Sequence, residues 1–167
     1  NPSSGANKVT IDSREFRNAL GNFATGVTIV TCLDAGGNKV GMTANSFSSL
    51  SLTPPLVLWS IAKTSSNFCN FEQAEHFNIH ILCAAQQDLA NQFASNNVDR
   101  FAGVELEQSS NPAPALSGCL SRFECSVEHR YEGGDHIILV GRLEHLQNQG
   151  GEPLLFSQGK YRHLETL

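Results

Sequence analysis

Apolar and polar residues alternate along residues 119–131 and again along 135–145, and this period of two predicts a pair of antiparallel strands. A three-residue loop over 132–134 gives a register in which apolar and charged positions both match across the pair, so we predict it in preference to a two-residue turn. The opposed residues are then Val127 with Leu139, Phe123 with Leu143, Glu124 with Arg142, and Arg122 with Glu144. In this register His136 lies just past the loop, on the face opposite the core and next to Arg130.

Shorter strands and a few helices are expected in the rest of the chain. We expect the apolar stripe of the first helix, which includes Phe16 and Leu20, to pack on the core. Hairpins dominate and no regular βαβ alternation appears, so the pattern predicts a mainly β fold, an antiparallel barrel with short peripheral helices. The predicted strands are 26–33, 39–43, 56–61, 77–82 and one near 153–156, the predicted helices are 12–22, 65–71 and 86–94, and 105–116 is expected to be an irregular connection.

Composition is that of one ordinary globular domain. The chain has 167 residues, of which 40% are apolar and 16% charged, and a net charge of −5. Only 11 scattered Lys and Arg residues are present, which argues against a nucleic-acid partner. The sequence contains no run of about 18 apolar residues, so no membrane-spanning helix is predicted. We expect residues 1–11 to form a flexible tail without the apolar core of a signal peptide, and residues 12–167 to form the single domain.

Cysteine and histidine spacing predicts no metal site. The five cysteines are odd in number and widely spaced, which is typical of free thiols in a reducing cytoplasm. Cys119 and Cys125 would lie roughly 20 Å apart on a strand, and His76 and His80 roughly 13 Å apart. The chain also lacks a CxxC pair, a GxGxxG or P-loop motif, and a GxSxG nucleophile motif, and no pair of carboxylates stands out.

The stretch 41–66, GMTANSFSSLSLTPPLVLWSIAKTSS, is rich in short hydroxyl and amide side chains. It contains one cation, Lys63, and no acidic residue, which suits a polar, phosphate-bearing ligand lying along the backbone. These side chains could equally be polar residues at strand edges, so composition alone leaves ligand binding and a purely structural role open.

Several motifs occur together in a specific order. They are FATGVTIVT (23–31), the 41–61 segment, FNIHIL (77–82) with its following helix to residue 94, DRF (99–101), the GDH triplet (134–136) and PLLFSQGKYRHL (153–164). This ordered set resembles the flavin reductase-like family, the small reductase components of two-component flavin-dependent monooxygenases. The resemblance implies an FMN-binding split barrel of antiparallel Greek-key type, working as a homodimer with flavin at or near the subunit interface.

The resemblance also implies roles for individual residues. The segment 43–46 would line the isoalloxazine edge, largely through backbone groups, and 60–63 would flank the ring and the ribityl chain. His136 matches the histidine of the GDH triplet, near the nicotinamide nucleotide, and Tyr161 would line the same pocket. The implied cofactor-binding residues are Thr43, Ala44, Asn45 and Ser46 for the ring, Ser60, Ile61, Ala62 and Lys63 for the ring and ribityl chain, Ser49, Lys63, Ser65 and Ser66 for the phosphate, Arg100 and Phe101 closing over the phosphate or adenylate, and His136 and Tyr161.

The function that the resemblance implies is an NAD(P)H:flavin oxidoreductase. It would transfer a hydride from nicotinamide to FMN or FAD without a catalytic side chain and supply reduced flavin to a partner monooxygenase. Two alternatives stay open: a flavoprotein with permanently bound FMN that reduces a ferric chelate, a cobalamin or a quinone, and a non-catalytic flavin-binding barrel. FMN against FAD also stays open, as does NADH against NADPH, although the scarcity of basic residues near His136 beyond Arg130 disfavours a 2′-phosphate site.

Overall fold

The computed structural model describes residues 10–167. The predicted tail over 1–11 therefore falls outside the described residues except for Thr10 and Ile11, which are exposed and belong to no helix or strand.

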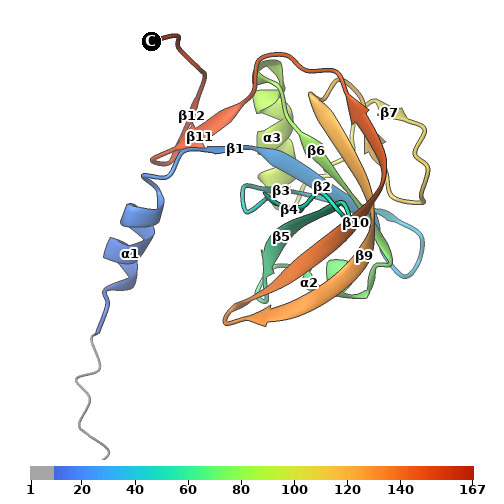
Figure 1. Ribbon diagram of the computed structural model, residues 1–167, viewed down its shortest axis with the longest axis horizontal. Helices are drawn as coiled ribbons and strands as arrows, with labels where there is room; N and C mark the ends of the chain where they lie inside the picture. Colours follow the sequence, from blue (N-terminus) through green and yellow to red (C-terminus); the bar gives the residue numbers. More distant parts are fainter. Residues whose placement is uncertain (1–9) are drawn as a thin grey trace, which may run out of the picture.

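Seven antiparallel strands form the main sheet, in the order β3–β2–β6–β9–β10–β5–β4 (Figure 1). The two edge strands of this order, β3 and β4, are joined by only residues 45–47, so the two edges of the sheet meet and the sheet curls into a barrel. The strands are β2 (Thr28–Leu33), β3 (Lys39–Ala44), β4 (Ser48–Ser51), β5 (Leu56–Ala62), β6 (His76–Ile81), β9 (Ser121–Gly133) and β10 (His136–Asn148).

Helices cover parts of the barrel, and two small sheets extend it. The short strands are β1 (Thr25–Gly26), β11 (Leu155–Ser157) and β12 (Lys160–Arg162) in one sheet, and β7 (Leu106–Glu107) with β8 (Ala115–Leu116) in the other. The helices are α1 (Ser13–Leu20), α2 (Phe68–Gln73) and α3 (Gln87–Ala94), the last preceded by the 3-10 turn η1 (Ala84–Gln86). The mainly β barrel with peripheral helices is confirmed. None of the helices in the described part of the chain is long and apolar enough to cross a membrane.

The core has two parts. Inside the barrel, the buried Trp59 packs edge-to-face on Phe71, with ring centroids 4.9 Å apart. Between the barrel and α3, Phe93 is fully buried against β3. A Cβ atom at Gly41 would lie 2.5 Å from the Phe93 ring, so only glycine lets α3 approach β3 this closely.

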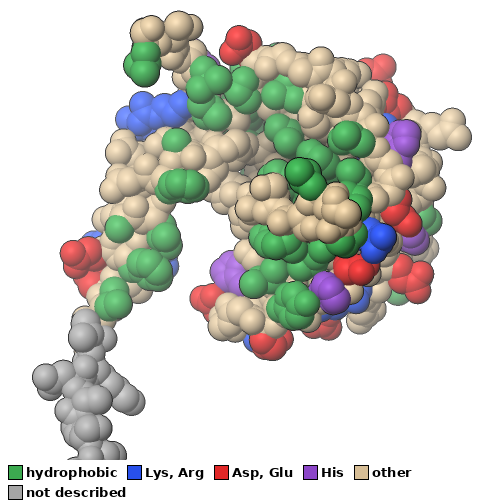
Figure 2. All heavy atoms as spheres, in the orientation of Figure 1, with side chains coloured by type: hydrophobic (Ala, Val, Ile, Leu, Met, Phe, Trp, Pro, Cys, Tyr) green, Lys and Arg blue, Asp and Glu red, His purple; other side chains and the backbone are tan. Residues whose placement is uncertain are grey.

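The first helix departs from the prediction. It stands away from the barrel, and Figure 2 shows hydrophobic side chains along it beside a hollow in the surface. None of its residues is buried: Phe16 is 57% exposed and Leu20 58%. The expected packing of its apolar stripe on the core of the same chain is therefore wrong. The chain just after the helix is held by Gln158, whose backbone N–H donates to Gly21 O over 2.7 Å.

The register of the β9–β10 hairpin also differs from the prediction. His136 pairs with Gly133, so the turn has two residues, and Leu139 faces Arg130 instead of Val127. Irregularities at Val140/Gly141 and Leu143/His145 shift the pairing twice along the hairpin. The two-residue turn already moves Leu139 away from Val127, and the two irregularities move the later residues again, so the predicted apolar and charged pairs are all wrong.

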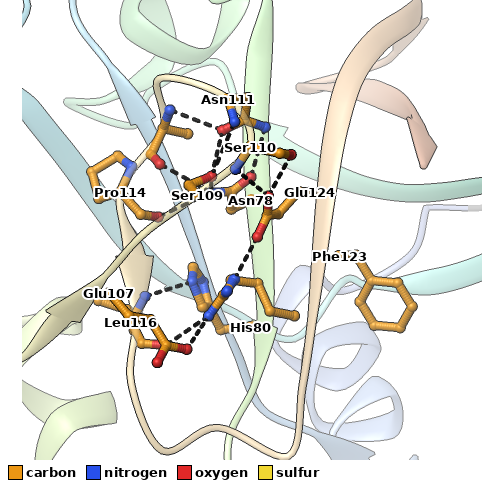
Figure 3. A network of polar contacts seen from close by, with 12 residues as sticks. Asn78, His80, Glu107, Ser109, Ser110, Asn111, Pro114, Leu116, Phe123 and Glu124 are labelled. Carbon is orange, nitrogen blue, oxygen red and sulfur yellow. Dashed lines mark hydrogen bonds and ion pairs between the residues drawn. The ribbon is translucent and has the colours of Figure 1, made fainter. Parts of the chain in front are cut away.

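Arg122 and Glu124 lie on the charged face of the predicted strand pair, and both are buried. The segment between β7 and β8 covers this face of the sheet, and polar contacts hold it there (Figure 3). Glu124 accepts hydrogen bonds from Ser110 N and Oγ, and Arg122 Nε donates to Glu124 Oε2 over 2.8 Å. Figure 3 shows that side chains from β6 join the same network, so the buried charges are paired and hydrogen-bonded.

Candidate functional site

The two polar halves of the 41–66 stretch lie side by side. Ser46 follows β3, and its Oγ donates to Ser60 O over 2.9 Å and accepts from Ser60 N over 3.1 Å. Ser60 belongs to β5, so a single serine ties the ends of two strands together where the edges of the sheet meet. The prediction that 43–46 and 60–66 form one continuous surface therefore has a geometric basis.

Two polar cavities open on this surface. One has a volume of about 450 Å³ and the other about 320 Å³, and they share four lining residues. The shared residues are Ser66, Asn67, Asn96 and Arg100, and the larger cavity also includes Met42, Thr43, Thr64, Ser65, Phe93 and Ala94. Hydroxyls, amides and a guanidinium are the donors that bind phosphate oxygens, so this lining suits the phosphate end of a nucleotide.

Arg100 is held in a fixed orientation. Its Nε donates to Ser95 O over 3.0 Å and its Nη1 to Gly41 O over 2.8 Å, while Nη2 has no protein acceptor among the described residues. Partial burial lowers the pKa of the guanidinium from its usual value, because the charge has lost part of its hydration. An anion in the shared cavity would compensate that loss without a rearrangement of the side chain.

A smaller, mostly apolar cavity of about 230 Å³ adjoins the polar ones. It shares Thr43 and Ala94 with the larger polar cavity, so the two are contiguous. Its remaining lining residues are Val27, Ala44, Asn45, Phe156 and Tyr161. Thr43 Oγ1 donates to Ala90 O over 2.6 Å, so this hydroxyl holds α3 against β3.

His136 is brought to the end of β5. It lies opposite Ala62 in the β10–β5 pairing, and the adjacent Asp135 O accepts from Lys63 N over 2.9 Å. Its Nδ1 lies 2.7 Å from Asp135 Oδ1, and the hydrogen bond from His136 lowers the pKa of Asp135. Because an ionised carboxylate only accepts, the Nδ1–H of His136 donates to Asp135, and Nε2 points away from this pair. The predicted neighbour Arg130 instead lies opposite Leu139.

Some predicted site residues lie apart from these cavities. Lys63 Nζ is 2.7 Å from Glu132 Oε1, so the one cation of the stretch is paired with the hairpin tip. Ser49 lies opposite Val57 on the edge strand β4 and lines none of the three cavities, and the Ile61 side chain is buried in the barrel core.

Phe101 lines the smaller polar cavity and packs edge-to-face on Phe93 at 4.9 Å. Lys39 lines the same cavity, with Nζ 5.9 Å from the Phe101 ring centroid, and sequence reasoning missed it. The period of two along β3 could have found it, because that period puts Lys39 on the same face as Thr43. Asn67, Asn96 and Phe156 were also missed, and they belong to turns and to a short strand with no local signal.

Among residues 10–167, no group of three or more His, Cys, Asp and Glu side chains could hold a metal ion. The candidate site consists of a mostly apolar cavity next to two polar cavities that share the oriented guanidinium of Arg100. A planar ring attached to a phosphate by a flexible chain fits this donor set. Flavin mononucleotide has that composition, and the predicted flavin thus agrees with the residues present.

The comparison with protein families matches residues 20–165 of the chain to the flavin reductase like domain. The chain belongs to this family, and its fold is a split barrel of the flavin reductase type. It is 46% identical over 150 residues to the FMN reductase (NADH) SmoA of Agrobacterium fabrum, covering 90% of this chain and 85% of that protein.

Two further relatives extend this similarity. The reductase component of the flavin-dependent trigonelline monooxygenase of Acinetobacter baylyi is 45% identical over 89% of this chain, which spans only 48% of that protein. The NADH:FAD oxidoreductase SgcE6 of Streptomyces globisporus, solved in complex with NAD and FAD fragments, superposes with a TM-score of 0.87 at 36% identity. That alignment covers 92% of this chain and 93% of the solved one.

Proposed function

We propose that this chain is an NAD(P)H-dependent flavin reductase that transfers a hydride from nicotinamide to FMN or FAD and supplies the reduced flavin to a partner monooxygenase. The observation that carries the proposal is the contiguity of the apolar cavity and the Arg100 cavity at Thr43 and Ala94. The relatives named as reductases of flavin and as a reductase component of a monooxygenase support the same activity.

In this proposal the flavin ring lies along residues 43–46 and the phosphate lies at Arg100. The side chains at 43–46 are short, so the ring can approach the backbone closely and receive hydrogen bonds from backbone N–H groups. Ser65 and Ser66 line the larger polar cavity with Arg100 and supply further donors to the phosphate. Bound flavin supplies the hydride-accepting ring, so the protein contributes orientation and hydrogen bonds.

His136 is proposed to contact the nicotinamide nucleotide. Asp135 holds the imidazole through Nδ1, and the ring is 42% exposed, so Nε2 can accept a hydrogen bond from an incoming ligand. The position opposite Ala62 puts it beside the proposed ring and ribityl segment. NADH is the expected donor, because Lys63, a cation that contacts the hairpin tip, is already paired with Glu132.

One assay tests the function: oxidation of NADH by purified protein, followed with and without added FMN or FAD. Strong stimulation by free flavin supports a reductase that uses flavin as a substrate. Activity that does not depend on free flavin, from a yellow protein, supports permanently bound flavin and another electron acceptor. An absence of NADH oxidation under both conditions would refute the enzymatic proposal and favour a non-catalytic flavin-binding barrel.

The role of His136 has its own test. His136→Ala should raise the KM for NADH about tenfold, the effect of roughly one hydrogen bond to a ligand, and leave FMN affinity unchanged. His145→Ala is the matched control, since His145 is an exposed histidine further along the same strand. Equal losses in NADH and FMN binding would count against the nicotinamide role.

We also propose that the chain works as a homodimer in which a second copy covers α1. An isolated helix of 8 residues is marginal in water, and Phe16 and Leu20 of α1 are exposed beside the hollow shown in Figure 2. Leu20→Glu should therefore shift the protein toward monomer in analytical ultracentrifugation. Arg14→Glu adds the same side chain on the opposite face of the helix and should leave the mass unchanged. A wild-type monomer at micromolar concentration would refute the proposal.

A cytoplasmic location is part of the proposal. All five cysteines are free thiols in the structure, including the exposed Cys69, and free thiols persist in reducing compartments.

A further inference from the structure

Two cysteines outside the proposed flavin site lie next to each other. Cys83 precedes η1, and Cys119 lies just before β9. The Cys83 sulfur is 3.7 Å from Gly118 O, an oxygen that only three covalent bonds separate from the Cα atom of Cys119. Gly118 has φ +77°, a conformation that glycine adopts without strain.

One glutamine contacts both thiols. Gln86 Nε2 lies 3.6 Å from the Cys119 sulfur, and the Gln86 backbone N–H donates to the Cys83 sulfur in the cap of η1. The Gln86 side-chain oxygen also accepts from Cys83 N over 2.9 Å. The two thiols and this amide therefore form one compact cluster, whereas Cys32 and Cys125 lie in the barrel core and Cys69 is exposed on α2.

The two thiols differ in access. Cys83 is partly exposed, so a small oxidant in solution can reach it, whereas Cys119 is only 7% exposed. The pKa of the Cys119 thiol is raised to about 11, mainly by burial and in smaller part by the neighbouring Cys83. Cys119 is thus protonated at neutral pH, and oxidation would begin at Cys83.

We propose that Cys83 and Cys119 are a peroxide-sensitive thiol pair that closes to a disulfide and thereby weakens flavin binding. In the first step the Cys83 thiolate attacks hydrogen peroxide, the O–O bond breaks, and a sulfenic acid and hydroxide form. In the second step the Cys119 sulfur attacks the Cys83 sulfur, the S–O bond breaks, and the hydroxyl leaves as water with the Cys119 proton. In total the two thiols lose two electrons, and one hydrogen peroxide is reduced to two water molecules.

The proposed function supplies the oxidant. Reduced flavin that meets dioxygen before it reaches a monooxygenase passes two electrons to oxygen and yields hydrogen peroxide. The thiol pair would then be oxidised when reduced flavin is produced faster than the monooxygenase consumes it. The inference rests on the proposed function for this source and for the position of the ring site. In the test below, added peroxide replaces the source, and the Cys83–Cys119 linkage is measured separately from FMN affinity.

The effect on flavin follows from the position of Gln86. A disulfide needs the two sulfurs about 2.05 Å apart. Gln86 contacts the Cys119 sulfur through Nε2 and the Cys83 sulfur through its backbone N–H, so a movement that joins the sulfurs also shifts Gln86. Gln86 is the last residue of η1 and directly precedes α3. That helix accepts the Thr43 hydroxyl at Ala90 O and lines the apolar cavity with Ala94, so a shift of its first turn alters the proposed ring site.

The test treats purified, reduced protein with hydrogen peroxide and maps its peptides without reduction. A linked pair of peptides containing Cys83 and Cys119 is expected, and it should disappear on addition of dithiothreitol. FMN affinity should fall at least about fivefold on oxidation, the lower range of typical coupling between sites, and recover with dithiothreitol.

Cys83→Ser and Cys119→Ser should each bind FMN normally and lose the response to peroxide. Cys69→Ser is the matched control, because it removes the most exposed thiol, and it should respond as the wild type does. The absence of the Cys83–Cys119 linkage in oxidised wild-type protein would overturn the proposal. A linkage that leaves FMN affinity unchanged would overturn the coupling to the flavin site.

Discussion

Replacing Glu124 with glutamine tests whether the buried ion pair holds the 105–116 segment on the barrel. Glu124 is fully buried, and its Oε1 accepts from Ser110 N over 2.7 Å and from Ser110 Oγ over 2.6 Å (Figure 3). Its Oε2 accepts from Arg122 Nε. A glutamine keeps the same shape and one acceptor for Ser110. Its amide nitrogen would face the Arg122 N–H, so a donor would meet a donor.

The expected loss can be worked out from these contacts. A hydrogen bond to a charged group contributes about 1.5–3 kcal/mol, and removing one partner of a buried ion pair costs about 3–5 kcal/mol. Arg122 keeps a second partner, Glu107, which neutralises part of its charge. We therefore expect Glu124→Gln to lower the free energy of unfolding by about 3 kcal/mol, and Tm by roughly 6–12 °C for a domain of this size.

Urea denaturation followed by tryptophan fluorescence measures this loss, because Trp59 is the only tryptophan and is fully buried. Glu128→Gln is the matched control, since Glu128 lies on the same strand, is exposed, and approaches Arg142 only to 3.8 Å. The control should stay within about 0.5 kcal/mol of wild type. A Glu124→Gln loss below about 1 kcal/mol would refute the reasoning, because the ion pair would then not be what holds the segment.

Three further predictions follow from single residues. Burial lowers the pKa of His80 to about 4, so on acidification the unfolded chain takes up the proton at a higher pH than the folded one. The free energy of unfolding should therefore fall by roughly 3 kcal/mol from pH 6.5 to 4. Urea midpoints should show this pH dependence in the wild type and lose it in His80→Gln, and a wild-type midpoint that does not change with pH would contradict the prediction. Arg100→Met should weaken FMN binding about 10–100-fold in fluorescence titrations and leave riboflavin, which has no phosphate, unaffected; equal losses would exclude a phosphate contact. Gly41→Ala should cost about 1–3 kcal/mol because its Cβ would meet the Phe93 ring, and an unchanged Tm would refute the close packing.

Local pattern predicted the secondary structure well where the pattern is regular. The hairpin from 26 to 43, the strand over 56–61 and the helix over 86–94 all appear, although β1 and β2 divide the first strand. The pairing of β9 with β10 could not be predicted, because two bulges reset the alternation that the register argument assumes to be unbroken. A bulge depends on what packs against the strand, and that information lies in distant residues.

The buried charges show the same limit. Arg122 and Glu124 alternate with apolar residues, which is the pattern of a strand with one face in water. That face is covered instead by a segment that pattern alone described as an irregular connection. The burial of His80 has the same cause. Its Nδ1 is hydrogen-bonded to Ile29 O, and its Nε2 accepts from Leu116 N at the end of the covering segment. No local signal marks a loop that returns to cover a sheet.

Part of the candidate site could be predicted because its residues are close in sequence. Hydroxyl composition identified 41–66, and the structure joins its halves through Ser46 and Ser60. The proposed role of Arg100 came only from the resemblance, since a loop arginine has no distinctive spacing. Its hydrogen bond to Gly41 O explains how the loop reaches the site, and that contact depends on tertiary structure.

The barrel topology gives a physical reason for the place of the site. Strands β3 and β4 are the edges of the main sheet, so each has one side whose backbone N–H and C=O groups lack a partner strand in that sheet. Residues 45–47 link these edges. A ligand lying there can form hydrogen bonds with backbone groups that, in an interior strand, would already be bonded to a neighbouring strand. Hydride transfer between two bound rings requires position and hydrogen bonds but no side-chain nucleophile. The junction of the two sheet edges, with the short side chains of 43–46 and the oriented guanidinium of Arg100 nearby, suits these requirements.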